Sequence, residues 1–180
     1  TENPLHILQE IIDNSADEAI SGNADVVSIQ CFEDGSFSVQ DNGRGIPIGI
    51  HPVENIPTVE LVFTRLHAGG KFNKTMNSSY NFSGGLHGVG VSVTNALSEK
   101  MDVSVFRDGY EWNITFKNGV VQGKLIRLKK TKRTGTKIRA WPNSSYFDES
   151  NIPLKLLERS LLSKAILLPG VTFDLFDEKK

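Results

Sequence analysis

Residues 5–20 read Leu-His-Ile-Leu-Gln-Glu-Ile-Ile-Asp-Asn-Ser-Ala-Asp-Glu-Ala-Ile, the most informative stretch of the chain. Asn3 can cap a helix whose first residue is Pro4, and Ser21-Gly22 can end it. Apolar residues recur on one side of this helix, as they do on a helix that packs against a sheet. We therefore predict an amphipathic helix over residues 5–20.

The polar side of this predicted helix has an unusual composition. At about 100° per residue, four polar side chains fall within roughly 80° of one another, namely His6, Glu10, Asn14 and Asp17. No Lys or Arg in the helix balances the acids. A glutamate one turn from a histidine can act as a general base, and an asparagine oxygen suits Mg²⁺. Most polar helix faces are simply solvated, which favours a surface helix. The residue types favour the other interpretation, a site that activates water beside a metal-bound phosphate.

A predicted hairpin and a glycine-rich turn follow the helix. The strands are expected over residues 26–32 and 36–40, and Asp41-Asn42-Gly43-Arg44-Gly45-Ile46-Pro47 comes directly after them. A carboxylate at a strand end, backed by glycines that let a ligand approach the backbone, can accept a hydrogen bond from an amine such as adenine N6. A plain Asx turn would use the same residues, so two interpretations of Asp41 stand side by side.

A second glycine-rich stretch covers residues 67–90 and is long enough to be a functional lid. It ends in Ser83-Gly84-Gly85-Leu86-His87-Gly88-Val89-Gly90 before a helix predicted over residues 91–97, where backbone N–H groups and the helix dipole favour phosphates. The spacing fits neither the P-loop nor the dinucleotide-binding fingerprint. Lys71 could neutralise the terminal phosphates or could be a solvated loop lysine.

The remaining segments alternate strands with helices. Helices are predicted over residues 57–66 and 153–167, and further strands over residues 102–107, 110–116, 120–128, 136–141 and 171–176. Asp108-Gly109 and Asn118-Gly119 are strong hairpin turns. These elements predict an α+β fold in a single domain, residues 1–180, with helices on one face of a largely antiparallel sheet.

The composition of the 180 residues is that of an ordinary globular protein, with 38% hydrophobic and 23% charged residues and a net charge of -1. Disorder and a fibrous structure are therefore excluded, and net charge does not indicate a nucleic-acid surface.

The single cysteine, Cys31, excludes an internal disulfide, and no apolar run approaches the roughly 18 residues of a membrane span. We expect a cytoplasmic chain, excised from a longer one because no initiator Met is present.

One basic cluster begins near the end of the strand predicted over residues 120–128 and continues into the loop before the next strand. It consists of Arg127, Lys129, Lys130, Lys132 and Arg133. A run of this kind is usually a solvated loop. A nucleic-acid surface is the less favoured alternative, and charge reversal in the cluster would distinguish the two.

Three of these motifs, in this order, resemble the ATP-binding fold shared by gyrase, the Hsp90 chaperone, histidine kinases and the MutL repair protein, the GHKL ATPase family. They are Glu-x-x-x-Asn in the first helix, Asp-x-Gly-x-Gly after the second strand and Gly-Gly-Leu-His-Gly-Val-Gly before a helix. Longer strings, among them residues 10–19, 66–72 and 134–136, resemble the ATPase subunits of the bacterial type IIA topoisomerases, gyrase and topoisomerase IV. The resemblance covers nearly the whole chain and implies a two-layer α/β sandwich of the Bergerat type with a mixed, mostly antiparallel sheet.

The resemblance also implies roles for individual residues. Glu10 would be the general base, assisted by His6, Asn14 would coordinate Mg²⁺, and Asp41 would bind the adenine amine. The other implied ATP-binding residues are Gly45, Ile46, Lys71, Tyr80, Gly84, Gly85, Leu86, His87, Gly88, Val89, Gly90 and Thr136. Arg44 would pair with Glu18. An outer shelf for inhibitors of the family would consist of Arg44, Ile46, Pro47 and Arg107.

The implied activity is ATP binding and hydrolysis with Mg²⁺, coupled to closure of a dimer gate and to DNA strand passage. The implied partners are a second copy of the full-length protein in a homodimer, the DNA-cleaving A (or C) subunit of the topoisomerase and DNA, with no membrane. Because the arm and the transducer-domain lysine of this family lie outside the 180 residues, we expect slow or absent hydrolysis by this segment. The alternatives are a nucleotide-dependent interaction module without catalysis, and a chaperone or mismatch-repair ATPase of the same fold.

Overall fold

The structure is a computed structural model that describes residues 2–65 and 90–180. Its helices are α1 (Leu5–Ile20), α2 (Thr58–Thr64), α4 (Gly90–Ala96) and α5 (Leu154–Leu167), with a short 3₁₀ helix at Ser144–Tyr146. Its strands are β1 (Val26–Cys31), β2 (Phe37–Asp41), β3 (Ser98–Arg107), β4 (Tyr110–Lys117), β5 (Val120–Lys130), β6 (Gly135–Pro142) and β7 (Thr172–Asp177).

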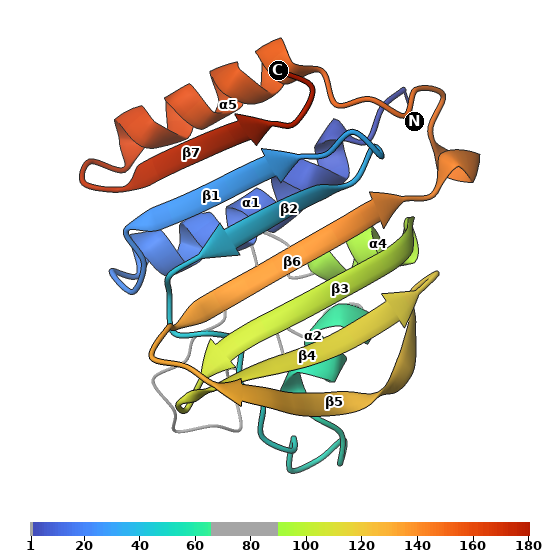
Figure 1. Cartoon of the computed structure of the whole chain (residues 1–180), viewed down its shortest axis with the longest axis vertical. Coiled ribbons are helices and arrows are strands. Elements are labelled where there is room, and N and C mark those ends of the chain that lie inside the picture. Colours follow the sequence, from blue (N-terminus) through green and yellow to red (C-terminus); the bar gives the residue numbers. More distant parts are fainter. Residues whose placement is uncertain (1, 66–89) are drawn as a thin grey trace.

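The strands form one seven-stranded sheet in the order β5-β4-β3-β6-β2-β1-β7 (Figure 1). Neighbouring strands run antiparallel except β1 and β7, which are parallel. The predicted mixed, mostly antiparallel sheet is therefore confirmed. Because β2 pairs with β6, the end of β2 at Asp41 lies beside the start of β6, although about a hundred residues separate them in the chain.

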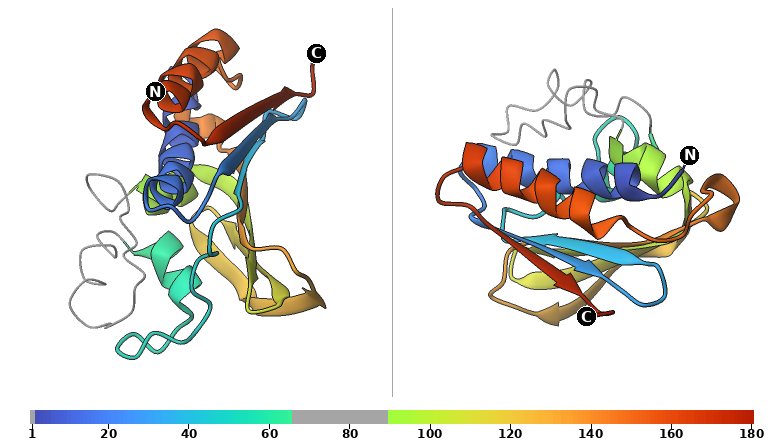
Figure 2. Two further views of the ribbon diagram at one scale, coloured as in Figure 1. Left: turned by 90° about the vertical axis from the view of Figure 1, so that its left-hand side faces the viewer. Right: turned by 90° about the horizontal axis from the view of Figure 1, so that it is seen from above.

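The four helices lie on the same face of the sheet, so the domain has two layers (Figure 2). The core fills the space between the layers and combines the apolar face of α1 with alternate residues of the strands. The largest fully buried side chains include Leu8, Ile12, Phe37, Phe63 and Phe116. Burial of such side chains, at about 1.5 to 3 kcal/mol each, is what holds the polar face of α1 in a defined place.

Helix α1 follows its sequence signals closely. The predicted range of residues 5–20 is the observed one, and Oδ1 of Asn3 accepts a 3.0 Å hydrogen bond from the backbone N–H of Leu5. The helix ends at Ser21, and Gly22 adopts a φ of +77° that a glycine tolerates without strain. The hairpin turns are confirmed as well, because Asp108-Gly109 and Asn118-Gly119 have positive φ at both positions, as type I′ turns require.

Two strands extend two or more residues beyond a predicted end. Strand β3 begins at Ser98 rather than at residue 102, because Ser98 and Lys100 pair with the end of β6 across a bulge. Strand β5 continues to Lys130, which pairs with Tyr110. The prediction of a basic loop was therefore wrong for Lys129 and Lys130, which belong to an edge strand. Cross-strand pairing outweighs the polar local sequence at both places.

No helix within residues 2–65 and 90–180 is long and apolar enough to cross a membrane.

Candidate functional site

Asp41 is a buried carboxylate at the end of β2, with only 4% of its surface exposed. Its Oδ2 accepts a 2.9 Å hydrogen bond from the Ser15 hydroxyl, and its Oδ1 accepts bonds from the backbone N–H groups of Gly43 at 2.9 Å and Thr136 at 3.4 Å. Burial, with a smaller contribution from the nearby Glu18, raises the pKa of Asp41 to about 6 against the opposing effect of these donors. The carboxyl group thus stays ionised at neutral pH with three donors fixing its orientation.

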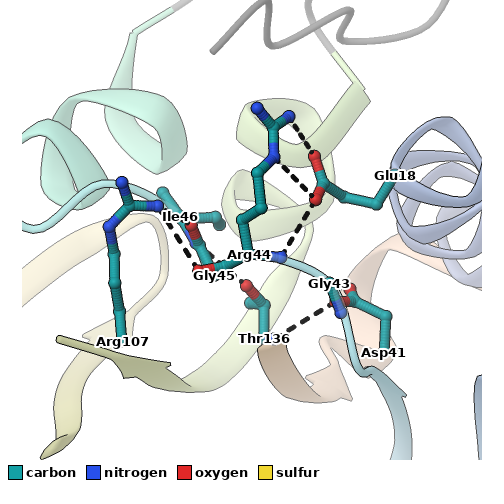
Figure 3. Close-up of polar contacts among 8 residues, drawn as sticks. All are labelled: Glu18, Asp41, Gly43, Arg44, Gly45, Ile46, Arg107 and Thr136. Carbon is teal, nitrogen blue, oxygen red and sulfur yellow. Dashed lines mark hydrogen bonds and ion pairs between the residues drawn. The ribbon is translucent and has the colours of Figure 1, made fainter. Parts of the chain in front are cut away.

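Thr136 connects the Asp41 carboxylate to the loop that follows β2. Its hydroxyl oxygen accepts a 3.1 Å hydrogen bond from the backbone N–H of Ile46, and its own N–H approaches Asp41 (Figure 3). Thr136, Ile46 and Asp41 are all buried. The β2–β6 pairing therefore brings together two segments that sequence analysis assigned to one pocket.

The polar face of α1 is exposed at its N-terminal end and becomes covered further along the helix. His6 is exposed at 71% of its side chain, but Glu10 is exposed at only 33%, and Asn14 is 9% exposed as a whole residue. The His6 Nε2 and Glu10 Oε1 atoms are 3.6 Å apart. The interpretation of α1 as an ordinary surface helix is wrong for this face beyond His6, since a buried Asn14 and a largely covered Glu10 are not a solvated surface.

Glu10 lies against the first residue of α4. A Cβ atom at Gly90 would collide with the Glu10 carboxylate, so only glycine leaves room for this approach. Helices α1 and α4 are also joined by a 3.3 Å hydrogen bond from the Thr94 hydroxyl to the backbone carbonyl of Ile7. The glutamate is thereby placed at the point where the glycine-rich stretch enters a helix.

Two arginines hold the loop that runs from Gly43 to Pro47, Arg44 from within the loop and Arg107 from β3. The Arg44 guanidinium donates to the Glu18 carboxylate through Nη2 at 2.8 Å and through Nε at 3.3 Å, so the ion pair that the resemblance implied is present. Arg107 Nη1 donates to the backbone carbonyl of Gly45 at 2.7 Å (Figure 3). Gly45 has a φ of +78° and abuts the backbone of β3 and β6, so a side chain at this position would be strained. The loop is thus fixed from both sides.

Asn42 holds the entrance of this loop to β1. Its Oδ1 accepts from the backbone N–H groups of Asp25 at 3.0 Å and Val26 at 3.1 Å, and its amide donates to the Asp25 carboxylate at 2.6 Å. An acid at this position would face the Asp25 carboxylate, whereas the amide can donate to it. The asparagine therefore suits this particular chain.

The structure brings together some of the predicted site residues and leaves others outside the described range. Those that it places around the ends of β2 and β6 and the polar face of α1 are His6, Glu10, Asn14, Asp41, Arg44, Gly45, Ile46, Pro47, Gly90, Arg107 and Thr136. Those that fall outside the described residues are Lys71, Tyr80, Gly84, Gly85, Leu86, His87, Gly88 and Val89, together with nearly all of the predicted lid. Among the described residues, no group of three or more His, Cys, Asp or Glu side chains forms a metal site.

Sequence analysis missed two partners of Asp41. Ser15 supplies a hydroxyl from α1, and Gly43 supplies a backbone N–H from the turn. Ser15 had a detectable signal, because it is a polar residue on the apolar side of the helix, next to Ile11 and Ile12. A buried hydroxyl needs a partner, and Asp41 is the strand-end carboxylate that the sequence analysis singled out.

Comparison with known proteins agrees with this geometry. The sequence model described as "Histidine kinase-, DNA gyrase B-, and HSP90-like ATPase" matches residues 2–145. The chain belongs to this family of ATPases.

Within the family, the chain is similar to ATPase subunits of bacterial topoisomerases. It is 47% identical over 180 residues to the B subunit of DNA topoisomerase 4 from Salmonella typhimurium, covering 99% of this chain and 28% of the relative. It is 47% identical over 174 residues to the B subunit of DNA gyrase from Mycobacterium leprae, covering 97% of this chain and 25% of that one. The chain thus spans about a quarter of the length of the curated relatives that it matches.

A solved structure has the same fold. The ATP-binding domain of topoisomerase IV from Francisella tularensis, solved in complex with a small-molecule inhibitor, superimposes with a TM-score of 0.86 at 41% sequence identity. The match covers 99% of this chain and 83% of that chain. The two-layer ATPase fold inferred from the sequence is therefore confirmed.

Proposed function

We propose that this chain is the ATP-binding domain of a bacterial type IIA topoisomerase subunit of the topoisomerase IV or gyrase B type. In the full-length subunit, binding and hydrolysis of ATP with Mg²⁺ would drive closure of a dimer gate and passage of DNA. The observation that supports this most strongly is the Asp41 carboxylate, buried at the end of β2 and held by donors from α1, the turn and β6. Membership of the ATPase family supports the same assignment.

Asp41 would select adenine. An ionised carboxylate offers only acceptors, and the exocyclic N6 amine of adenine is a donor. Guanine carries an O6 acceptor at the equivalent position, which a carboxylate repels. Thr136 and Ile46 would lie at the same edge of the base, and the hydrogen bond between them would fix their positions there. Tyr80, outside the described residues, would contact the base from the lid.

Glu10 would activate the water that attacks the terminal phosphate. It lies one turn from His6, which would assist it, and against Gly90 at the start of α4, where phosphates would lie. Lys71 and residues 84–90 would hold the phosphates, as the motifs suggest.

Asn14 would hold Mg²⁺ one turn beyond Glu10. Its buried amide offers an oxygen of the kind that Mg²⁺ accepts, and this ion commonly has only one or two protein ligands, with substrate phosphates and waters completing its shell. When bound, Mg²⁺ would neutralise the phosphate charge. The residues present fit that requirement.

The outer shelf would consist of Arg44, Pro47 and Arg107 beside Ile46. The Arg44–Glu18 pair and the Arg107–Gly45 bond give it a fixed shape, which suits the binding of a rigid inhibitor. The Francisella tularensis domain was solved in complex with a small-molecule inhibitor, which supports inhibitor binding by a domain of this fold.

We propose residues 1–180 as one domain of a longer cytoplasmic protein. That protein would pair with a second copy of itself and with the DNA-cleaving A (or C) subunit of the topoisomerase. Completion of the catalytic site by a lysine of a following domain would leave this segment weakly active or inactive alone.

A comparison of adenine and guanine nucleotides as ligands tests the proposal on this chain. Calorimetric titration with non-hydrolysable analogues of ATP and of GTP, each with Mg²⁺, should give one-site binding of the adenine analogue and at least tenfold weaker binding of the guanine analogue. Equal affinities would remove Asp41 from base recognition and contradict the assignment. An Asp41→Asn variant in the same titration tests whether the preference comes from the carboxylate.

A further inference from the structure

Charge is strongly segregated in this nearly neutral chain. Residues 117–139 contain nine of the 20 Lys and Arg residues and none of the 21 Asp and Glu residues. The remaining 157 residues therefore carry 11 basic and 21 acidic side chains, a net charge of -10 against +9 in the segment. The overall charge of -1 is thus the sum of an acidic part and a basic segment, and this segment produces a local basic field of the kind that binds polyanions.

Six of these cations lie along one edge of the sheet. They are Lys124, Arg127, Lys129, Lys130, Lys132 and Arg133, here called the β5 basic edge, and all six are exposed. Strand β5 is the terminal strand of the sheet, and most of its residues are exposed (Figure 1). The basic edge thus extends from the middle of β5 through the turn that leads into β6.

Most of these charges lack an acidic neighbour. Lys129 lies 3.7 Å from Glu111, and in the described part of the chain the other five members form no ion pair within 4.0 Å. Residues 66–89, which the structure does not describe, contain no Asp or Glu. An external anion is therefore the natural counter-charge.

The two arginines are held in place by aromatic rings. The Arg127 guanidinium lies 4.5 Å from the centre of the Tyr110 ring, and that of Arg133 lies 4.4 Å from the centre of the Phe106 ring. Stacking leaves the edges of a guanidinium free to donate, and a pre-oriented fork loses less entropy when it binds a phosphate. Such pairs suit phosphate recognition better than freely rotating side chains do.

Protection of an edge strand is a simpler role for some of these lysines. Exposed edges commonly carry Lys to prevent pairing with another chain, and Ile126 and Leu128 make β5 a strand that needs such protection. This role accounts for a few charges within the strand. It does not account for Lys132 and Arg133 in the turn, or for the complete lack of acids over 23 residues.

We propose that the β5 basic edge binds the phosphate backbone of duplex DNA without sequence preference. The choice of DNA as the polyanion rests on the proposed topoisomerase function. At about 3.4 Å per residue, the six steps from Lys124 to Lys130 span about 20 Å, the length of about six base pairs. Base edges are not read by such a surface, so affinity should come from counterion release.

The basic edge continues directly into the candidate nucleotide site. Lys132 and Arg133 precede Thr134, whose hydroxyl donates to the backbone carbonyl of Asn42 at 3.4 Å, and Thr136, whose N–H approaches Asp41. DNA on the edge and a nucleotide at Asp41 would therefore share one turn of the backbone. This places the proposed contact where it can affect, and be affected by, the loop around the base.

Fluorescence anisotropy with a labelled mixed-sequence duplex of about 20 base pairs tests the proposal on this chain. The test variant is Lys124→Gln/Lys130→Gln/Lys132→Gln, and the control is Lys155→Gln/Arg159→Gln/Lys180→Gln, which removes the same charge from α5 and the C-terminal end. Wild type should bind with a Kd of about 10⁻⁴ to 10⁻⁶ M, and the slope of log K against log salt should become shallower by about 2 to 3 in the test variant alone. Affinity should fall at least tenfold in the test variant and less than twofold in the control.

Equal losses in the two variants, or no loss in the test variant, would overturn the proposal. Tighter binding of polyglutamate than of DNA at matched charge would also overturn it, in favour of an acidic protein partner. Both variants should bind the ATP analogue within twofold of wild type, since none of the six substituted residues belongs to the candidate site. Failure of ATP-analogue binding in the wild type would contradict the proposed function instead, so the two failures are distinguishable.

Discussion

The Ser15 hydroxyl donates a 2.9 Å hydrogen bond to Oδ2 of Asp41, 26 residues further along the chain, and both side chains are buried. This bond ties the helix that carries Glu10 to the strand that carries the candidate adenine acceptor. The base-binding and water-activating parts of the site are therefore held in one frame. A substitution of Ser15 should therefore alter the Asp41 carboxylate, although Ser15 itself would make no direct contact with a base.

Removing this donor should weaken nucleotide binding. In Ser15→Ala, the ionised form of Asp41 loses a stabilising partner, so the pKa of Asp41 rises further above its usual range. The net value of one such bond is about 1 kcal/mol, so the further rise in pKa leaves fewer Asp41 side chains ionised and should lower the affinity for an ATP analogue about threefold at pH 6 and less than twofold at pH 7. Calorimetry at pH 6 and 8.5 checks this, and the loss should disappear at the higher pH. Ser163→Ala, which removes a hydroxyl bonded only to its own helix on α5, is the control.

The raised pKa of Asp41 predicts a dependence of stability on pH. Its value of about 6, against an ordinary 3.8, means that ionisation is less favourable in the folded chain. The contribution of Asp41 to stability is therefore greatest below pH 4 and is lost as the pH rises towards 6 and above, by about 3 kcal/mol for a difference of about two pH units. Asp41→Asn should lack this loss.

Urea unfolding of wild type and Asp41→Asn at pH 4 and pH 7 measures this effect. The free energy of unfolding of the variant minus that of wild type should be larger, in the direction of a more stable variant, at pH 7 than at pH 4 by about 2 to 3 kcal/mol. A difference that does not change with pH would show that Asp41 titrates as it does in water.

Substitution of Glu10 should separate binding from turnover. In the full-length subunit, Glu10→Gln keeps the shape of the side chain but removes the base, so ATP turnover should fall by a factor of about 10² or more, as is typical of a lost general base. Binding of an ATP analogue should change by less than threefold. Asp13→Asn is the matched control on the same helix, because Asp13 pairs with Lys164 of α5 at 2.6 Å instead of contributing to the site. Normal turnover in Glu10→Gln would assign the base elsewhere.

Gly90→Ala should damage the same site sterically. The added methyl group would occupy the space of the Glu10 carboxylate and would force either the side chain or the start of α4 to move. We expect turnover in the full-length subunit to fall at least tenfold, as misplacement of a catalytic group by about 1 Å can cost more than that. Gly49→Ala is the control, since Gly49 has open space around its Cα. Similar activities of the two variants would mean that a methyl group at residue 90 does not displace the Glu10 carboxylate.

The local features of the fold were predictable because they depend on neighbouring residues. The cap at Asn3, the stop at Gly22 and the turns at Asp108-Gly109 and Asn118-Gly119 are each determined within a few positions. The strand order was not predictable in the same way. The parallel contact of β7 with β1 joins residues about 145 apart, and no local pattern specifies it.

The residues of the candidate site also divide into those that the local sequence predicts and those whose positions depend on the order of the strands. Glu10, Asn14 and Asp41 could be proposed from residue type and spacing alone, whereas Thr136 and Arg107 entered only through the resemblance to a family. Their positions depend on β2, β6 and β3 lying side by side, which brings Thr136 to Asp41 and Arg107 to Gly45. Burial also removes one of the two interpretations that the sequence left open for the polar side of α1, since Asn14 is buried and does not lie on a solvated face.

Calorimetric titration of the 180-residue chain with a non-hydrolysable ATP analogue and Mg²⁺, for wild type and Asp41→Asn in parallel, tests the central claim most directly. The variant replaces an obligate acceptor with a group that can present a donor to the adenine amine. We predict saturable one-site binding by the wild type and at least a tenfold loss of affinity in Asp41→Asn. Equal affinity of the two proteins would contradict the account, because the buried carboxylate at the end of β2 would then not be where the base is recognised.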